Sequence, residues 1–296
     1  MNKKSFESID FLYQGMPAKL SKAEKKAASK AKKAERKAVV LRERAQKKVV
    51  ADCNALTNVL EGFEAFCTVK LVAAAPAAEA AAAADEAAAP APASDDASLP
   101  TAHAITFARA CDLDDATRVA IFGLLKTNME AKYDAAWGWS DKVKKKELNE
   151  EDARFCLVRS PAGDLIAFSH FRFSLEGVYK VIYIYEVQVD ATYRSQGLGK
   201  RLVQLLELLA VKKKMEWTMC TVFKCNERSM SFFTGKMKYE IDETSPSMAE
   251  VYEEATYEIL SKNLMRKAKL DAVARAAPIA ATKSGWEPGM PLPVEE

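Results

Sequence analysis

The segment 194–200, Arg-Ser-Gln-Gly-Leu-Gly-Lys, constrains the fold more than any other part of the chain. Before it, residues 178–189 are dense in β-branched and aromatic side chains, which predicts a strand. After it, apolar residues recur at helical spacing over 202–209, which predicts a helix with one buried face. A strand that runs through glycines into a helix indicates an α/β domain.

The same glycines predict a ligand that carries phosphate. Gly197 and Gly199 let the backbone approach a phosphate, and the first amides of a helix bind anions. Arg194 and Lys200 flank them, so a diphosphate is the expected occupant. The chain lacks the third glycine of a dinucleotide site, and Lys200 is not followed by the Ser or Thr of a P-loop. A turn that merely joins strand to helix is the alternative.

Charge is uneven along the chain. Residues 19–48 hold thirteen Lys or Arg against three Glu, a balance of +10, so the total of +3 leaves the remainder near −7. Repeated Ala, Lys and Glu predict a long exposed helix over 19–50. A basic arm favours a polyanion such as nucleic acid or chromatin, and an acidic body favours a cationic substrate. A solvated helix beside an ordinary acidic domain is the alternative.

Composition sets the expected boundaries. Residues 73–100 are almost entirely Ala, Pro, Asp, Glu and Ser, and such a segment cannot bury enough surface to offset the entropy lost on ordering. The arm before it carries Leu60, Phe63 and Phe66, which we expect to dock on the core. The expected parts are a basic helical arm with this docking segment (1–72), a disordered Ala/Pro-rich linker (73–104), the patterned α/β domain (105–262) and a disordered tail (263–296).

Hydrophobic periodicity predicts alternating helices and strands within the domain. Residues 161–164, Pro-Ala-Gly-Asp, predict a hairpin turn between the first two strands. Besides the helix after the glycines, the expected helices are 116–132 and 227–234, and the expected strands are 155–159, 165–173, 178–189, 217–223 and 256–260.

The six cysteines and two histidines have no metal-ligand spacing, so we expect no metal site. With so few histidines, proton transfer falls to carboxylate, tyrosine or water. The sequence shows neither a signal-like apolar segment nor a run long enough to cross a membrane. We therefore expect no membrane attachment and a reducing compartment, the nucleus and cytoplasm.

In its context, the segment 194–200 resembles the acetyl-CoA pyrophosphate loop of the GNAT acetyltransferase superfamily. The pattern is Arg-x-x-Gly-x-Gly-Lys between a strand and a Leu-rich helix. The resemblance implies acetyl-CoA as co-substrate and the GNAT acyl-CoA N-acyltransferase fold, a three-layer α/β arrangement around a central mixed sheet with splayed strands. It also implies a bulge at Val187, Gln188 and Val189, whose backbone groups meet the acetyl and pantetheine portions.

Further stretches resemble one type within the superfamily, the NatD N-alpha-acetyltransferases, which modify histones 4 and 2A at the N-terminus Ser-Gly-Arg-Gly. The resemblance covers 113–261 closely and the basic arm more loosely. The stretches are 126–129, 137–139, 167–173, 185–188, 221–226, 240–242, 245–248 and 257–261.

Three residues are implied for catalysis. Glu186, beside the expected bulge, is the candidate base. Because an α-amine has a pKa of ~8, little basicity is needed to deprotonate it. Tyr183 and Tyr185 alternate with isoleucines, so their rings share a face, and the resemblance places them in the peptide slot. The hydroxyl that many members carry seven residues after Asn226 is missing at Phe233, so Tyr185 or water serves as the acid. A half-exposed strand carboxylate and core tyrosines are the alternatives.

Contacts with acetyl-CoA are implied for the loop, the bulge, the next strand and the helix after it. Asn226 has a second interpretation as the N-cap of that helix. The implied residues are Val187, Gln188, Val189, Arg194, Ser195, Gln196, Gly197, Leu198, Gly199, Lys200, Thr221, Asn226 and Phe232.

The peptide-binding residues that the resemblance implies are Tyr133, Trp137, Glu176, Tyr183, Tyr185 and Tyr257. Glu176 matches an acid that holds the arginine of the substrate, because a guanidinium leaving water needs a carboxylate partner. Ser174 stands where the family usually has a second acid. For Trp137 the alternative is core packing, with Trp139 exposed.

Together these patterns predict a monomeric enzyme that transfers acetyl from acetyl-CoA to the α-amino group of histone N-terminal tails. Two alternatives stay open. A GNAT enzyme for side-chain lysine or a small amine shares the loop but needs no lid of Tyr133 and Trp137. A non-catalytic module binds chromatin through the basic arm.

Overall fold

The computed structural model describes residues 22–72, 100–248 and 255–265. It divides into two units, Met1–Lys47 and Lys48–Glu296, each taken by itself. In the first unit the described residues belong to helix α1 (Lys22–Asn54), which matches the helix expected there, and their described Lys and Arg side chains are exposed. Within the described ranges, no helix is long and apolar enough to cross a membrane.

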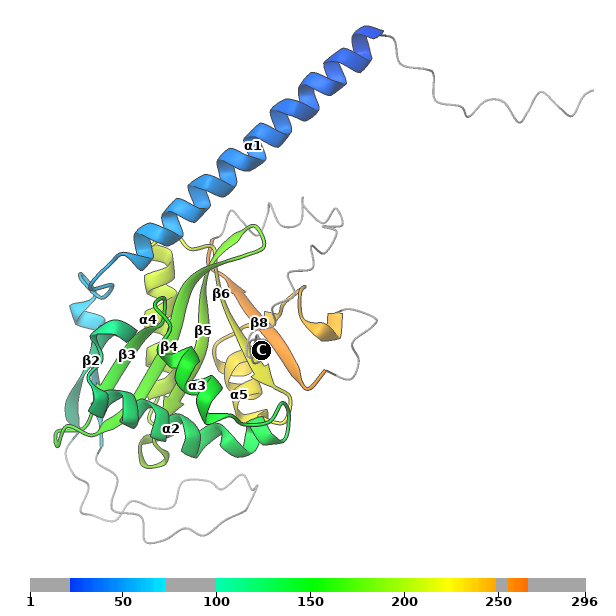
Figure 1. The fold of residues 1–296 in the computed structure, drawn as a ribbon. Coiled ribbons are helices and arrows are strands. Elements are labelled where there is room, and N and C mark those ends of the chain that lie inside the picture. The colour runs from blue at the N-terminus through cyan, green and yellow to red at the C-terminus, as the bar shows by residue number, and fades with distance from the viewer. Residues whose placement is uncertain (1–21, 73–99, 249–254, 266–296) are drawn as a thin grey trace, which may run out of the picture. The chain divides into compact units, whose positions relative to one another are not determined.

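The second unit is an α/β domain built on one mixed sheet (Figure 1). The described strands follow the order β1-β2-β3-β4-β5-β6-β8-β7, with β5 and β6 parallel and the other neighbours antiparallel. The helices are α2 (Asp115–Asp134), α3 (Asp141–Leu148), α4 (Leu198–Lys212) and α5 (Glu227–Ser231), and the strands are β1 (Thr68–Leu71), β2 (Thr101–Arg109), β3 (Arg154–Arg159), β4 (Leu165–Glu176), β5 (Tyr179–Val189), β6 (Trp217–Phe223), β7 (Glu240–Ile241) and β8 (Tyr257–Asn263).

Helices cover both faces of the sheet, so the expected three-layer arrangement is confirmed (Figure 1). The reason is visible in β3, where successive side chains point to opposite faces. Phe155 and Leu157 pack in the cluster that α2 completes, whereas Cys156 and Val158 pack in the cluster that α4 completes. Both faces of the strand are apolar, and each requires a helical layer.

Helix α4 begins at the predicted glycines. Gly197 is its N-cap, with φ +83, a left-handed conformation that strains any residue with a Cβ. From there Leu202, Leu206 and Leu209 point into the core and are fully buried. The leucine spacing thus determines which face of the helix meets the sheet.

Several boundaries differ from those expected. β2 begins at Thr101 and pairs with β1, with Leu71 opposite Thr101, so 101–104 belong to the sheet and not to a linker. β8 continues to Asn263, one residue into the expected tail. The sequence patterns also do not predict β1, α3 or β7. The predictions for 73–99 and 266–296 lie outside the described residues.

The expected docking segment contributes two of its three apolar residues to the core. Leu60 and Phe63 are buried in the same cluster as the leucines of α4. Phe66 is instead 42% exposed, with the guanidinium of Arg201 5.3 Å from its ring centre. The segment that carries Leu60 and Phe63 is therefore part of the folded domain.

Replacing Leu206 by Ala is expected to lower the free energy of unfolding by about 2–5 kcal/mol, because a fully buried leucine leaves a cavity. Chemical denaturation measures the loss. Gln204→Ala on the exposed face of the same helix is the matched control and should change stability by less than about 0.5 kcal/mol. Equal losses in the two variants would contradict the assignment of the buried face.

Candidate active site

A cleft opens where β5 and β6 stop pairing. The two strands are in parallel register over 181–184 and 217–220, and both continue beyond that point without a register between them. A pocket with about 720 Å³ of empty volume, open solvent included, lies between the separated ends. The splayed strands expected from the sequence are therefore present.

A β-bulge stands at the point where the strands separate. His170 is opposite Glu186 and Phe171 is opposite Ile184, so Tyr185 is the extra residue of β5. The bulge was expected at 187–189 and lies two residues earlier. As a result, the side chains of Tyr185 and Glu186 both line the pocket although they are neighbours in the chain.

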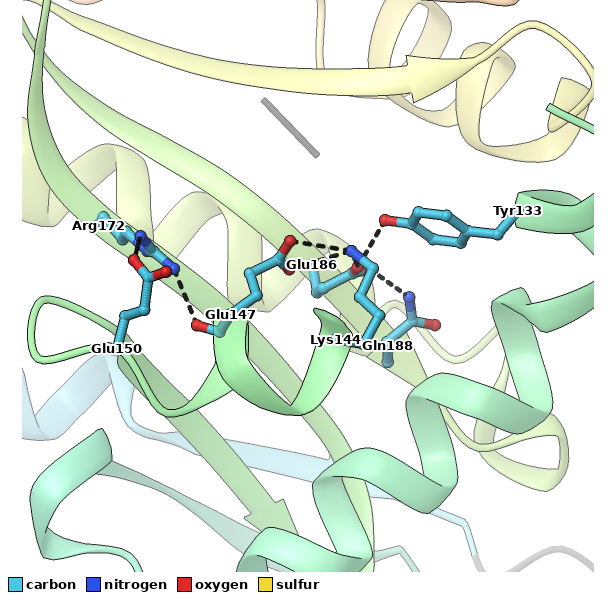
Figure 2. A network of polar contacts seen from close by, with 7 residues as sticks. All are labelled: Tyr133, Lys144, Glu147, Glu150, Arg172, Glu186 and Gln188. Carbon is cyan, nitrogen blue, oxygen red and sulfur yellow. Dashed lines mark hydrogen bonds and ion pairs between the residues drawn. The ribbon is translucent and has the colours of Figure 1, made fainter. Parts of the chain in front are cut away.

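Glu186 lines this pocket and is buried, with 5% of its surface exposed. Figure 2 shows its partners, which come from three elements. Gln188 donates from Nε2 to Oε2 at 2.8 Å, and the hydroxyl of Tyr133 on α2 donates to Oε1 at 3.4 Å. The ammonium of Lys144 on α3 lies 3.6 Å from Oε1. The carboxylate is thus held on both oxygens.

Burial raises the pKa of Glu186 above the usual range of a glutamate. The ammonium of Lys144 opposes this shift, and the carboxylate of Glu147 adds to it. A carboxyl group must be ionised to accept a proton. The fraction of Glu186 that can act as a base therefore decreases as the pH falls through this raised pKa.

Lys144 and Glu147 are site residues that the sequence patterns miss. They belong to the run 142–147, Lys-Val-Lys-Lys-Lys-Glu, which is typical of a solvated helix. The side chain of Lys144 is 5% exposed, whereas that of its neighbour Lys145 is 57% exposed. The available signal is Ser140, which caps α3 by accepting from the amide of Val143 and so starts a helix in that run.

The two predicted tyrosines share one face and line the pocket. Their ring centres are 5.3 Å apart. The hydroxyl of Tyr183 lies 2.6 Å from Oγ1 of Thr221, and the ring of Tyr185 stacks on His170 at 4.8 Å. Burial raises the pKa of both Tyr183 and Tyr185, so each keeps its proton at neutral pH.

Aromatic side chains form the wall opposite β5. Trp137 packs edge-on against Phe223 at 4.7 Å and Tyr257 at 5.1 Å, and Tyr133 packs on Phe223 at 4.8 Å. Tyr133 and Trp137 line the pocket, as expected, whereas Tyr257 lies behind Trp137 and is absent from its lining. Trp139 is half-buried and not exposed.

The predicted loop carries open backbone amides at the start of α4, next to Val187 of the pocket lining. Ser195 has φ +64 and Gly197 φ +83, and no side chain of the described residues caps α4. A methyl group at Gly199 would meet Phe232, Val187 and Val189 at 3.9 Å, ordinary contact distances. The glycine at 199 is therefore not required by the protein's own packing, which fits a bound phosphate that approaches the backbone there.

Two charged or polar side chains of the loop form hydrogen bonds within the domain. Arg194 donates to the carbonyl of Val189 at 3.1 Å and to Oδ1 of Asn128 at 2.5 Å. Gln196 forms two hydrogen bonds with the backbone of Val72. Both side chains were expected at the cofactor and neither lines the pocket, while the amides and the exposed Lys200 remain available for phosphate.

The remaining cofactor positions fall into two groups. Val187, Gln188, Thr221 and Asn226 line the pocket, and Asn226 also caps α5 by accepting from the amide of Ser229 at 3.3 Å. Leu198 does not face the pocket, because its side chain is buried in the core. Phe233 lines the pocket, so no hydroxyl enters from that position.

Glu176 is not brought to the pocket. It lies at the end of β4 opposite Tyr179, six residues from the register partner of Glu186, or about 20 Å of strand. It shares a sheet face with Tyr183, since alternate residues of a strand point to the same side. The sequence pattern alone does not reveal this separation.

Gly199→Ala is expected to weaken coenzyme A binding about tenfold or more, because the added methyl group takes the space of the approaching phosphate. The folded state should be as stable as before or more stable by up to about 1 kcal/mol, since alanine favours a helix. Calorimetric titration and thermal melting measure the two effects. Gly123→Ala, on the exposed side of α2, is the control and should leave the affinity unchanged. Equal affinities in both variants would refute the phosphate site.

Comparison with known proteins agrees with this geometry. Residues 120–239, which contain most of the pocket lining, match the model of the Acetyltransferase (GNAT) family. Similar solved structures include a GNAT-family acetyltransferase from Listeria monocytogenes (12% identity, 54% of this chain and 94% of that one, TM-score 0.39). Two others are the NatC complex bound to Gag peptide and CoA (18%, 54% and 99%, 0.41) and Arabidopsis thaliana Naa50 with the bisubstrate analogue CoA-Ac-MVNAL (18%, 53% and 97%, 0.39). Over residues 120–239, the domain that holds the pocket is thus similar to the Acetyltransferase (GNAT) family.

Proposed function

We propose that this chain is an N-alpha-acetyltransferase of the NatD type, which acetylates the α-amino group of histones 4 and 2A at Ser-Gly-Arg-Gly. The observation that carries the proposal is the position of Glu186, a buried carboxylate that lines the cleft together with Tyr133 and Trp137. On the proposed path, an amine reaches it past these aromatic side chains. The first residue of a peptide is suited to that path.

The residues around the cleft divide the chemistry between them. Bound acetyl-CoA supplies the acetyl group as a thioester. Glu186 accepts the proton that the substrate ammonium gives up, directly or through a water. Tyr185 carries a proton on its hydroxyl for the departing thiolate, because that hydroxyl has no hydrogen-bond partner among the described residues, whereas the hydroxyl of Tyr183 is paired with Thr221. Phe233 has no proton to give.

The arginine of the substrate is assigned to an acidic pair beyond the pocket. The carboxylate of Asp242 is near enough to add to the raised pKa of Glu176, for which burial is the larger cause. In the described part of the chain neither acid forms a salt bridge, so a guanidinium would relieve their repulsion. Asp242 thus replaces the acid that is missing at Ser174. Extended Ser-Gly-Arg spans about 10 Å of backbone, and the arginine side chain extends further.

The exposed cations of α1 support the same substrate class. They give this unit a surface that is attracted to the phosphates of chromatin. Histone tails are made in the cytoplasm and used in the nucleus, and we place the activity in both compartments on the strength of this substrate.

Acetyl-CoA turnover on four peptides tests the substrate. Ser-Gly-Arg-Gly with a free amine should react, while the same peptide with a blocked amine and a peptide whose only amine is a lysine side chain should not. Ser-Gly-Ala-Gly should react with a kcat/KM lower by about tenfold, the value of one charge-assisted contact. Glu176→Gln and Asp242→Asn together should abolish that preference for arginine. Turnover on the blocked peptide would instead identify a side-chain acetyltransferase.

Glu186→Gln is expected to slow acetyl transfer about tenfold or more, a loss of about 1.4 kcal/mol or more of transition-state stabilisation. The amide keeps the shape of the side chain but cannot accept the proton. Acetyl-CoA affinity should stay within about twofold, because the binding loop is unchanged. Steady-state kinetics and calorimetric titration measure the two quantities. Glu227→Gln, an exposed glutamate in the first turn of α5, is the control, and a wild-type rate in the Glu186 variant would refute the base.

A further inference from the structure

Lys144 occupies a position that a lysine rarely takes. It is buried, and its ammonium lies between two carboxylates, 3.0 and 3.2 Å from the oxygens of Glu147 and 3.6 Å from Oε1 of Glu186. The same nitrogen is 4.2 Å from the ring centre of Tyr133. A lysine leaves water only when paired charges compensate, and here two acids and one aromatic ring do so.

The helix that carries Lys144 is fixed to the sheet independently of the pocket. Arg172 on β4 donates to the backbone carbonyl of Glu147 at 2.9 Å and forms salt bridges with Glu150 at 2.7 Å and Asp152 at 3.2 Å. Figure 2 shows this guanidinium at one end of α3 and Glu186 at the other side of Lys144. A cation at the C-terminal end of a helix also interacts favourably with its carbonyls. The position of the ammonium is therefore set by β4 as well as by α3.

We propose that Lys144 is a positioning residue for the active site, which holds the Glu186 carboxylate ionised and oriented towards the substrate amine, with Glu147 anchoring the lysine. The inference rests on the proposed role of Glu186 as the base. Two carboxylates that share a buried space do not both stay ionised unless a cation lies between them. The lysine allows Glu186 to be both buried and basic.

The other groups that face Glu186 are uncharged and cannot replace the ammonium of Lys144. From α2, Tyr133 donates a hydrogen bond, and from β5, Gln188 does the same, both uncharged. On β4 the register partner is His170, and burial together with nearby Arg172 and Lys144 lowers its pKa well below the usual range, so the imidazole is neutral. The pocket residues of β6 and α5 are uncharged.

The test is the pH dependence of Lys144→Met, a variant of similar length without the charge. The acid limb of kcat/KM should move to higher pH by about one unit or more, because Glu186 then shares its space with Glu147 alone. Lys144→Met combined with Glu147→Gln should return the limb at least halfway, since one carboxylate no longer repels the other. Lys144→Arg keeps the cation and should keep the wild-type limb. Lys146→Met, on the exposed side of α3, is the control.

A direct titration separates this inference from the function on which it rests. Carbon-13 NMR of glutamate-labelled protein, with Glu186→Gln to assign the signal, reports the protonation of Glu186 without any substrate. The signal should titrate at higher pH in Lys144→Met than in wild type. An unshifted titration, or a rate that falls equally at every pH and is not restored by Glu147→Gln, would overturn the proposal. If Glu186→Gln keeps the wild-type rate, the base assignment fails even where the titration shift is seen.

Discussion

The short parallel register between β5 and β6 is the constraint on which the rest of the structure depends. A parallel pair needs a crossover helix, and α4 provides it. Because the crossover leaves from the end of β5, the first amides of α4 arrive beside the separated strand ends. The bulge at Tyr185 follows the last paired residue directly and bends β5 away from β6. Anion-binding amides, the cleft and the acidic side chain thus meet at one place.

Charge burial is the second condition that the site imposes on the fold. A carboxylate deep in an aromatic cleft is costly unless hydrogen bonds and an opposite charge accompany it. The domain supplies these from three elements, with Tyr133 on α2, Lys144 on α3 and Gln188 on β5 itself. Helix α3 has only eight residues, so its place depends on Arg172 and not on its own helical propensity. The geometry around the base is therefore a property of the whole layer that covers this face.

Much of this architecture can be read from the sequence, because glycine, leucine and β-branched residues report local structure. The strand over 178–189, the start of a helix at the glycines and the shared face of Tyr183 and Tyr185 follow from spacing alone. The position of the bulge does not, since register depends on the partner strand and a slip of two residues keeps the same alternation.

The partners of several polar side chains could not be predicted, for another reason. Arg194 and Gln196 flank a glycine loop and therefore suggest ligand contacts, yet Arg194 donates to the side chain of Asn128 on α2 and Gln196 donates to the backbone of Val72. Lys144 is hidden for the opposite reason, since its sequence neighbours are exposed lysines of the same type. Glu176 lies on the expected face but at a distance that only the register discloses. Long-range partners decide where a polar side chain points, and a single sequence does not contain them.

The pairing of β1 with β2 has a consequence for how such a chain changes over time. Leu71 lies opposite Thr101, and Gln196 fixes the backbone of Val72 just beyond β1, so the chain departs from the sheet and returns to it at neighbouring points. The entropic cost of closing a connection between adjacent points rises only slowly with its length, by about 0.6 kcal/mol for each doubling. The connection between these strands is thus a place where residues can be gained or lost by insertion and deletion while the catalytic cleft, on the other side of β4, keeps its geometry.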